Sequence, residues 1–109
     1  MAYSETVAAR IRESLSGTDG VSEKKMVGGV CFMVHGHMVA GVVGEELMLR
    51  LGRELTGQVL AMGHTRPMDF TGKVMKTMVY VAPKGFETDA DLKEWLQLAT
   101  DHARTLPPK

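Results

Sequence analysis

The sequence predicts an α+β fold, a two-layer sandwich in which helices cover an antiparallel sheet. The expected order is one helix, three or four strands, a second helix, one or two strands and a third helix. Two patterns lead to this prediction: apolar residues recur at helical spacing near both ends of the chain, and short apolar runs separated by glycine fill much of the part between. A parallel doubly wound fold would show strict alternation of strand and helix patterns, and this sequence does not.

The first helix is expected over residues 5–16. Ser4 precedes it and can accept a hydrogen bond from its first turn, while Gly17 and the polar residues that follow can end it. Four apolar residues recur at the spacing of one helical face: Val7, Ala8, Ile11 and Leu15.

The next part of the chain predicts an antiparallel meander. Three short apolar runs are each interpreted as a strand: Val30–Val34, Met38–Val43 and Leu47–Leu51. The pairs His35-Gly36 and Gly44-Glu45 separate these runs at spacings that suit tight hairpins, because glycine tolerates positive φ. A further strand is expected before them, over Val21–Met26.

A second helix is expected over Arg53–Met62, where one helical side is apolar: Leu55, Val59 and Met62. Gly63–Val74 is interpreted as a long loop. Met75–Val81 is rich in residues that favour strands and is followed by Pro83, so it predicts a strand that pairs with the meander.

The last helix has the clearest pattern, and it is expected over Asp89–Thr105. Thr88 can cap its first turn, with Asp91 three residues further on, and Pro107-Pro108 ends it. Six residues form its apolar stripe: Leu92, Trp95, Leu96, Ala99, Ala103 and Leu106.

Length and composition favour a single globular domain over residues 1–109. Of the 109 residues, 44% are hydrophobic and 24% are charged, which is typical of a chain that folds. Thirteen basic residues balance thirteen acidic ones, so no overall positive charge attracts a phosphate backbone, and we expect no nucleic-acid partner.

Compartment is predicted from what the sequence lacks. Cys31 is the only cysteine, which excludes an internal disulfide and thiolate-rich zinc sites, and favours a reducing environment. The first residues contain no apolar signal core, and no run approaches the roughly 18 apolar residues that span a bilayer. We therefore expect a cytoplasmic protein without a membrane segment.

Several short motifs follow one another along the chain. They are Met26-Val27-Gly28-Gly29 before the meander, Gly36 in a hairpin, Leu47-Met48-Leu49-Arg50, Arg66-Pro67-Met68, Phe70-Thr71-Gly72 and Met75-Lys76. In order and spacing the chain resembles the TfoX N-terminal domain family over nearly its whole length, with Val27 in place of the usual phenylalanine.

The resemblance implies a two-layer fold similar to that of secretion chaperones, a tendency to form dimers, and no established catalytic residues. It gives a structural role to a set of motif residues: Met26, Gly28, Gly29, Gly36, Pro67, Met68 and Gly72. The proteins that give the family its name regulate natural competence and carry a second domain. The present sequence ends at Lys109 without one, so we do not expect that role to carry over.

Alternation along the strands separates two sides of the sheet, and both are largely apolar. One side contains Phe32, Leu49 and Val79. The opposite side contains six residues that form a candidate partner-facing surface: Cys31, Met33, Met48, Arg50, Met78 and Tyr80. If the helices cover the first side, the second needs a partner, and methionine is common at adaptable binding surfaces. We therefore expect a homodimer; the alternative is that helices or the loop 63–74 cover this side.

Other candidate chemistry is weaker. His35 and His37, with His64 or His102, could bind a metal ion, but no third ligand has a diagnostic spacing. Cys31 lies in an apolar run where a thiol packs as a small hydrophobe rather than acting as a nucleophile. Gly28-Gly29 precedes a strand rather than a helix, so it does not predict a phosphate loop. We expect no catalytic residue, metal or cofactor.

The favoured function is a non-enzymatic interaction or regulatory domain. One alternative is a small-molecule-binding protein or enzyme with a pocket near Arg50 and Lys76. Another is a DNA-binding accessory factor, by analogy with competence regulators.

Overall fold

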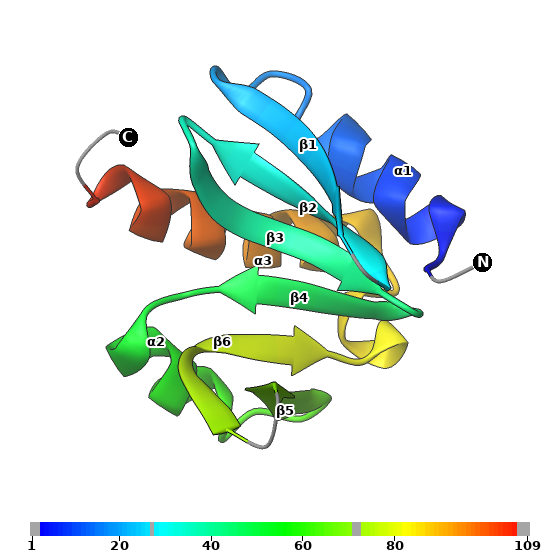
Figure 1. Ribbon diagram of the computed structural model, residues 1–109. Helices are drawn as coiled ribbons and strands as arrows, with labels where there is room; N and C mark the ends of the chain where they lie inside the picture. Colours follow the sequence, from blue (N-terminus) through cyan, green and yellow to red (C-terminus); the bar gives the residue numbers. More distant parts are fainter. Residues whose placement is uncertain (1–2, 27, 71–72, 107–109) are drawn as a thin grey trace.

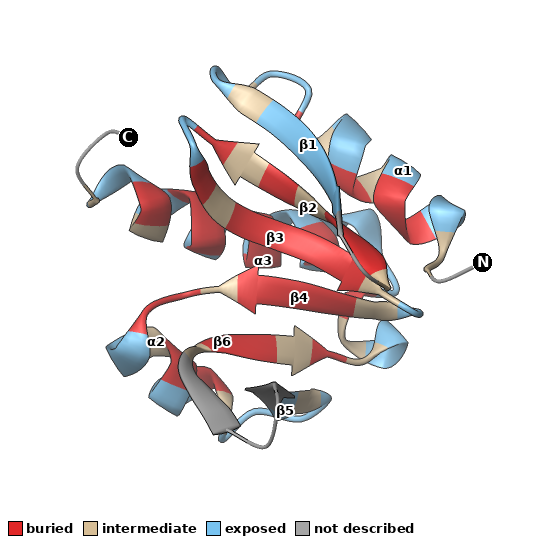
Figure 2. Cartoon of the chain, viewed as in Figure 1, coloured by how far each residue is buried: buried red, intermediate tan, exposed pale blue. Residues whose placement is uncertain are grey.

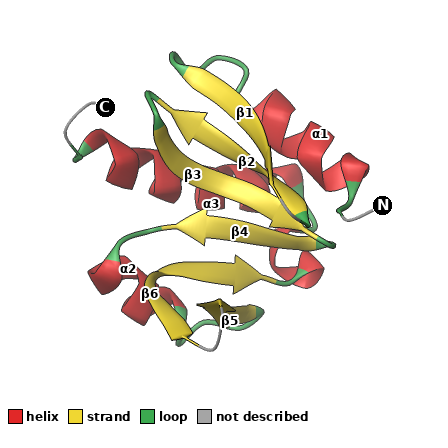
Figure 3. Ribbon diagram, viewed as in Figure 1, coloured by secondary structure: helices red, strands yellow, loops and turns green. Residues whose placement is uncertain are grey.

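The computed structural model describes residues 3–26, 28–70 and 73–106, and it describes no side chains for Met26, 68–70 and 73–76. Within these residues, a six-stranded antiparallel sheet forms one layer, and three α-helices with one short 3-10 helix form the other (Figures 1 and 3). The predicted two-layer α+β architecture is confirmed.

The strands pair in the order β1-β2-β3-β4-β6-β5. Their bounds are β1 Val21–Met26, β2 Gly29–Val34, β3 His37–Val43, β4 Glu46–Arg50, β5 Thr65–Phe70 and β6 Lys73–Val81. The first four form the expected meander, and β6 pairs with β4 through partners such as Leu49 and Val79. The edges of the sheet are therefore β1 and β5.

The hairpins have the turn chemistry that their sequences predict. His35 and Gly36 both have positive φ, at 50° and 84°, which is the requirement of a type I′ turn between β2 and β3. Between β3 and β4, Gly44 has a φ of 59° while Glu45 does not enter the positive region. Both turns therefore match the right-handed twist of the strands that they join.

The first and last helices are capped as expected. α1 spans Glu5–Ser14, and the Ser4 hydroxyl oxygen accepts a hydrogen bond from the Val7 amide at 3.3 Å. α3 spans Asp89–Arg104, and the Thr88 hydroxyl accepts from the Asp91 amide at 3.1 Å. Each cap satisfies an amide that has no partner within its helix.

The segment after β4 differs from the sequence prediction. α2 spans only Arg53–Val59, so Met62 lies beyond the helix and is exposed. The predicted loop 63–74 is wrong, because it contains β5 and the start of β6. Pro67 is tolerated in β5 because an edge strand has one neighbour and needs no amide on its free side; a bulge follows it.

The main core lies between the sheet and the helix layer. Phe32, Leu49 and Val79 are fully buried and face the helices, and they share this core with Ile11 of α1 and Leu92 of α3. The short helix η1 (Pro83–Phe86) closes one end of the core. Figure 2 shows the result, with β3 and β4 largely buried and β1 largely exposed.

The helices of the described chain are too short or too polar to cross a membrane.

Candidate functional site

The three described α-helices lie behind the sheet in Figure 1, which leaves the other side of the sheet without a helix across it. We call this helix-free side the outer face. It carries a second apolar cluster, separate from the main core and made of Met48, Met78, Cys31, Met38, Val43 and Tyr80. Four of the six residues predicted for this side belong to the cluster. Of the other two, Met33 pairs with Met38, and Arg50 pairs with Met78.

The cluster is partly closed by its own side chains. Met48 is fully buried and Met78 is 7% exposed, although no helix lies above them. A Cβ atom at Gly41 would lie only 2.6 Å from the Met48 Cε, so the missing side chain of this glycine makes room for the methionine. The half-buried margin that remains is formed by Cys31, Met33, Met38, Val43 and Tyr80.

Met38 and Val43 were missed by the sequence prediction, for different reasons. Val43 alternates with Val42 and could have been assigned to the outer face from the pattern alone. Met38 reaches this face because the pairing of β2 and β3 shifts after Phe32. The shift places the adjacent residues Val39 and Ala40 both in the main core, which simple alternation forbids.

Arg66 covers one end of the outer face and was also missed. Its guanidinium carbon lies 4.2 Å from the centroid of the Tyr80 ring, a cation–π contact. Its Nε donates to a Glu46 carboxylate oxygen at 3.0 Å, and its Nη2 donates to the other oxygen. Arg66 thereby links the edge strand β5 across β6 to β4.

The Cys31 thiol is a weaker acid on this face than an ordinary cysteine is. Burial raises its pKa above the ordinary value, and the positive charge of Lys24 on β1 opposes part of that effect. Lys24 is the register partner of Cys31. A raised pKa leaves little thiolate at neutral pH, which is unfavourable for a nucleophile.

Three basic side chains come near one another at one end of the domain. Burial lowers the pKa of His102, and the charges of Arg50 and His37 lower it further. Arg50 forms no ion pair with the side chains that the structure describes. Lys76 lies on β6, but its side chain is outside the described set, so the predicted pocket near Arg50 and Lys76 is not tested.

Of the other three histidines, only His37 acts on His102, and His35 and His64 lie elsewhere. His35 lies in the β2–β3 turn against Gly20, His37 is buried at the start of β3, and His64 lies beside Gly85. Within the described ranges, no three His, Cys, Asp or Glu side chains are grouped in a way that would hold a metal ion.

The glycine motif has a structural explanation. Gly28 has a φ of 82° in the β1–β2 turn, two residues after Met26 at the end of β1. A Cβ at Gly29 would lie 2.2 Å from the Val42 carbonyl oxygen, so β2 and β3 approach too closely for any side chain there. Of the other motif residues, Gly36 is in a turn, Pro67 and Met68 are in β5, and Gly72 lies outside the described residues.

Together, the fold and this surface define a class of protein: a small two-layer α+β domain with one helix-free, methionine-rich sheet face. The model of the TfoX N-terminal domain matches residues 13–103, and the chain belongs to that family. No curated protein and no solved structure matches it in the corresponding comparisons.

Proposed function

We propose that this TfoX N-terminal domain is a non-enzymatic interaction or regulatory module that acts in the cytoplasm as a homodimer formed through its outer face. The observation behind this proposal is the apolar cluster on the helix-free side of the sheet, whose margin of Cys31, Met33, Met38, Val43 and Tyr80 is only half buried in the single chain. Contiguous apolar surface of this kind is typical of protein contacts.

The composition of the margin suits a face-to-face contact. Met33 and Met38 are neighbours across β2 and β3, and methionine adapts its shape to a partner at little cost in strain. A standard interface takes about 800 Å² from each partner. That is about one eighth of the 6448 Å² that this chain exposes, an area that one face of a six-stranded sheet can supply.

A cytoplasmic setting is supported by Cys31, the single cysteine of the chain, which lies on the proposed interface. In an oxidising compartment such a thiol would be prone to intermolecular disulfides, whereas cytoplasmic reductants keep it reduced. The balanced charge of the chain favours a protein partner over a nucleic acid.

The test is the concentration dependence of molar mass by light scattering. Wild-type protein should approach the mass of a dimer as its concentration rises. Met33→Glu should weaken the dimer by more than about tenfold, since it places a charge within an apolar contact. Met62→Glu adds the same charge at an exposed site outside the outer face, and should leave the mass unchanged.

Two results would count against the outer-face dimer. One is a wild-type protein that stays monomeric at every concentration reached. The other is an equal loss of dimer in both variants, which would place the contact elsewhere or reflect net charge alone.

A further inference from the structure

The helix layer carries its own exposed apolar surface. Among the described residues, two large hydrophobic side chains are more than a third exposed: Met62 at 55% and Leu98 at 37%. Leu98 is on α3, and Met62 follows α2. Neither belongs to the outer face.

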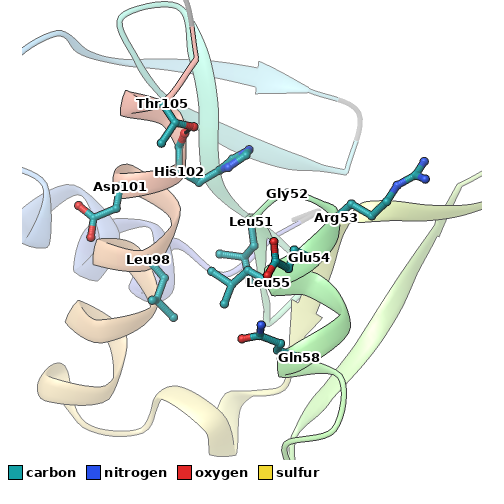
Figure 4. Close-up of a pocket in the computed structure, with 10 residues that line it drawn as sticks. All are labelled: Leu51, Gly52, Arg53, Glu54, Leu55, Gln58, Leu98, Asp101, His102 and Thr105. Atoms are coloured by element: carbon teal, nitrogen blue, oxygen red, sulfur yellow. Dashed lines mark hydrogen bonds between the residues drawn. The ribbon is translucent and has the colours of Figure 1, made fainter.

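Leu98 projects into a cleft of about 510 Å³ between α2 and α3. In Figure 4 its side chain points toward Leu51 and Leu55, which line the same cleft, while the guanidinium of Arg53 points away. Most of the surface inside the cleft is apolar, and polar side chains such as Gln58 and His102 also border it.

A second cleft of about 340 Å³ adjoins the first at Leu98. It is lined by Met62 and by Trp95, whose indole N–H donates to the Gly85 carbonyl at 3.0 Å. Residues of α3 line both clefts, from Asp91 in the second to His102 in the first, and we call the surface that the two clefts make along this helix the α3 groove. α3 has 16 residues and is about 24 Å long, enough to contact several turns of another helix.

The charges on the rim of the α3 groove are mainly negative. Glu54, Asp91 and Glu94 line it and form no ion pair with the side chains that the structure describes. Asp101 also lines it, but Arg104 lies 3.8 Å from its carboxylate. Two basic residues also line the clefts: Lys84 in the second and Arg53 in the first, where the guanidinium points away from the interior in Figure 4. A partner with basic residues beside an apolar strip would complement this arrangement.

We propose that the α3 groove binds the apolar face of a basic amphipathic helix from a partner protein. Leu55, Leu98 and Met62, which line the groove and are at least partly exposed, would contact leucine-like side chains on one face of that helix, as in other helix-in-groove complexes. Glu54, Asp91 and Glu94 would pair with its lysines or arginines. This surface lies in the helix layer, so it does not depend on the proposed homodimer.

The probe for this site is an 18-residue synthetic helix with leucines at positions i, i+3, i+4 and i+7, lysines elsewhere and no aromatic residue. Trp95 is the only tryptophan and lines the groove, so its fluorescence reports binding. Wild-type protein should bind one peptide, with an affinity that falls as salt is added, because the ion pairs are screened. Leu98→Asp should weaken binding by about tenfold or more, since a charged group then enters the apolar contact.

Matched variants separate the effect of a charge change in the α3 groove from the effect of the net charge of the protein. Glu94→Lys, in the groove, should weaken binding several-fold, whereas Glu13→Lys makes the same charge change on α1 and should not. The Met33→Glu variant should bind the peptide like wild type. The binding result can therefore be interpreted even if the protein does not dimerise through its outer face. Circular dichroism checks that each variant is folded.

Several results would overturn the proposal. They are the absence of binding at millimolar peptide, equal binding of a peptide with serines in place of its leucines, and equal losses in Glu94→Lys and Glu13→Lys. If Leu98→Asp instead lowers the molar mass of the protein alone, the groove is a contact between copies of this chain.

Discussion

At the scale of single residues, Cys31 shows how an apolar sheet face controls a thiol. Burial disfavours the thiolate, and Lys24 on the neighbouring strand favours it, so the pKa is set by two opposing effects of which burial is the larger. The reactive form should therefore appear only at higher pH than in a free cysteine.

Reversing the charge of Lys24 should make Cys31 still less reactive. In Lys24→Glu the pKa of the thiol rises further, so alkylation by iodoacetamide should be slower than in wild type at any pH below that pKa. Lys93→Glu makes the same charge change on α3, away from the outer face, and serves as the control. Equal alkylation rates in the two variants would show that Lys24 does not act on the thiol.

Two glycines around α2 should respond oppositely to alanine. Gly52 has a φ of 84°, and a Cβ there would lie 2.6 Å from the His102 ring, so Gly52→Ala should destabilise the fold by about 1–3 kcal/mol. Gly57 lies within α2, where a Cβ meets nothing within 4 Å, so Gly57→Ala should stabilise it by about 0.4–1 kcal/mol.

Chemical denaturation measures both free energies of unfolding. Combining Gly52→Ala with His102→Ala tests the proposed clash. The loss caused by Gly52→Ala should be smaller when His102 is already alanine, because only the strained φ then remains. If Gly52→Ala lowers the free energy of unfolding equally in both backgrounds, the His102 ring moves aside without cost and there is no clash.

At the scale of elements, the edge strand β5 is held by Arg66 as well as by its hydrogen bonds to β6. Arg66 contacts Tyr80 and pairs with Glu46, whose side chains lie on the next two strands. Because Arg66 and Glu46 are 51% and 29% exposed, solvent screens the ion pair and its contribution should be small.

A double-mutant cycle on Arg66→Ala and Glu46→Ala should give a coupling energy of about 0.5–1 kcal/mol, measured by denaturation. Arg66→Lys should lose most of this coupling, because lysine cannot form the two parallel hydrogen bonds. Coupling that is fully retained in Arg66→Lys would show that charge alone, rather than the planar guanidinium, links the strands.

Helices and strands whose apolar residues recur at a regular spacing were predictable from the sequence, and those without such a spacing were not. α3 and the meander follow from regular spacing of apolar residues and from turn glycines. β5 was missed because Pro67 and charged neighbours hide a strand that pairs on one side only. α2 was predicted too long, because a repeat of apolar residues cannot show where tertiary packing ends a helix.

The same distinction holds for the candidate sites. Alternation assigned Cys31, Met48 and Met78 to one side of the sheet, because the period of two is a property of each strand alone. The α3 groove was not predicted. It depends on where the fold places α2 relative to α3, which puts Leu55 and Leu98 around one cleft, and no local pattern in the sequence encodes that placement.

At the scale of the whole molecule, both edges of the sheet resist the addition of strands. β1 exposes Lys24 and Lys25, and β5 contains Pro67. Charges and proline on edges block pairing with other chains. Association through the edges is therefore disfavoured, which leaves the face of the sheet and the helix layer for contacts.

Replacing both lysines of β1 should remove this protection. The variant Lys24→Thr with Lys25→Val should form aggregates that bind thioflavin on prolonged incubation, while wild-type protein stays clear. Replacing Lys84 and Lys93, which lie outside the sheet, by the same two residues controls for lost charge. Equal aggregation of the two variants would argue that β1 is not the vulnerable edge.

The placement of the helices on one side of the sheet has a consequence for valency. Two copies that meet through their outer faces would turn their helix layers away from each other, so the dimer would present two α3 grooves on opposite flanks. Such a dimer would bridge two copies of one target, or bind a target with repeated helices through both grooves at once. Once the first groove is occupied, the effective concentration of the second is set by the rigid geometry of the dimer. A weak single contact could then give strong retention on an oligomeric target.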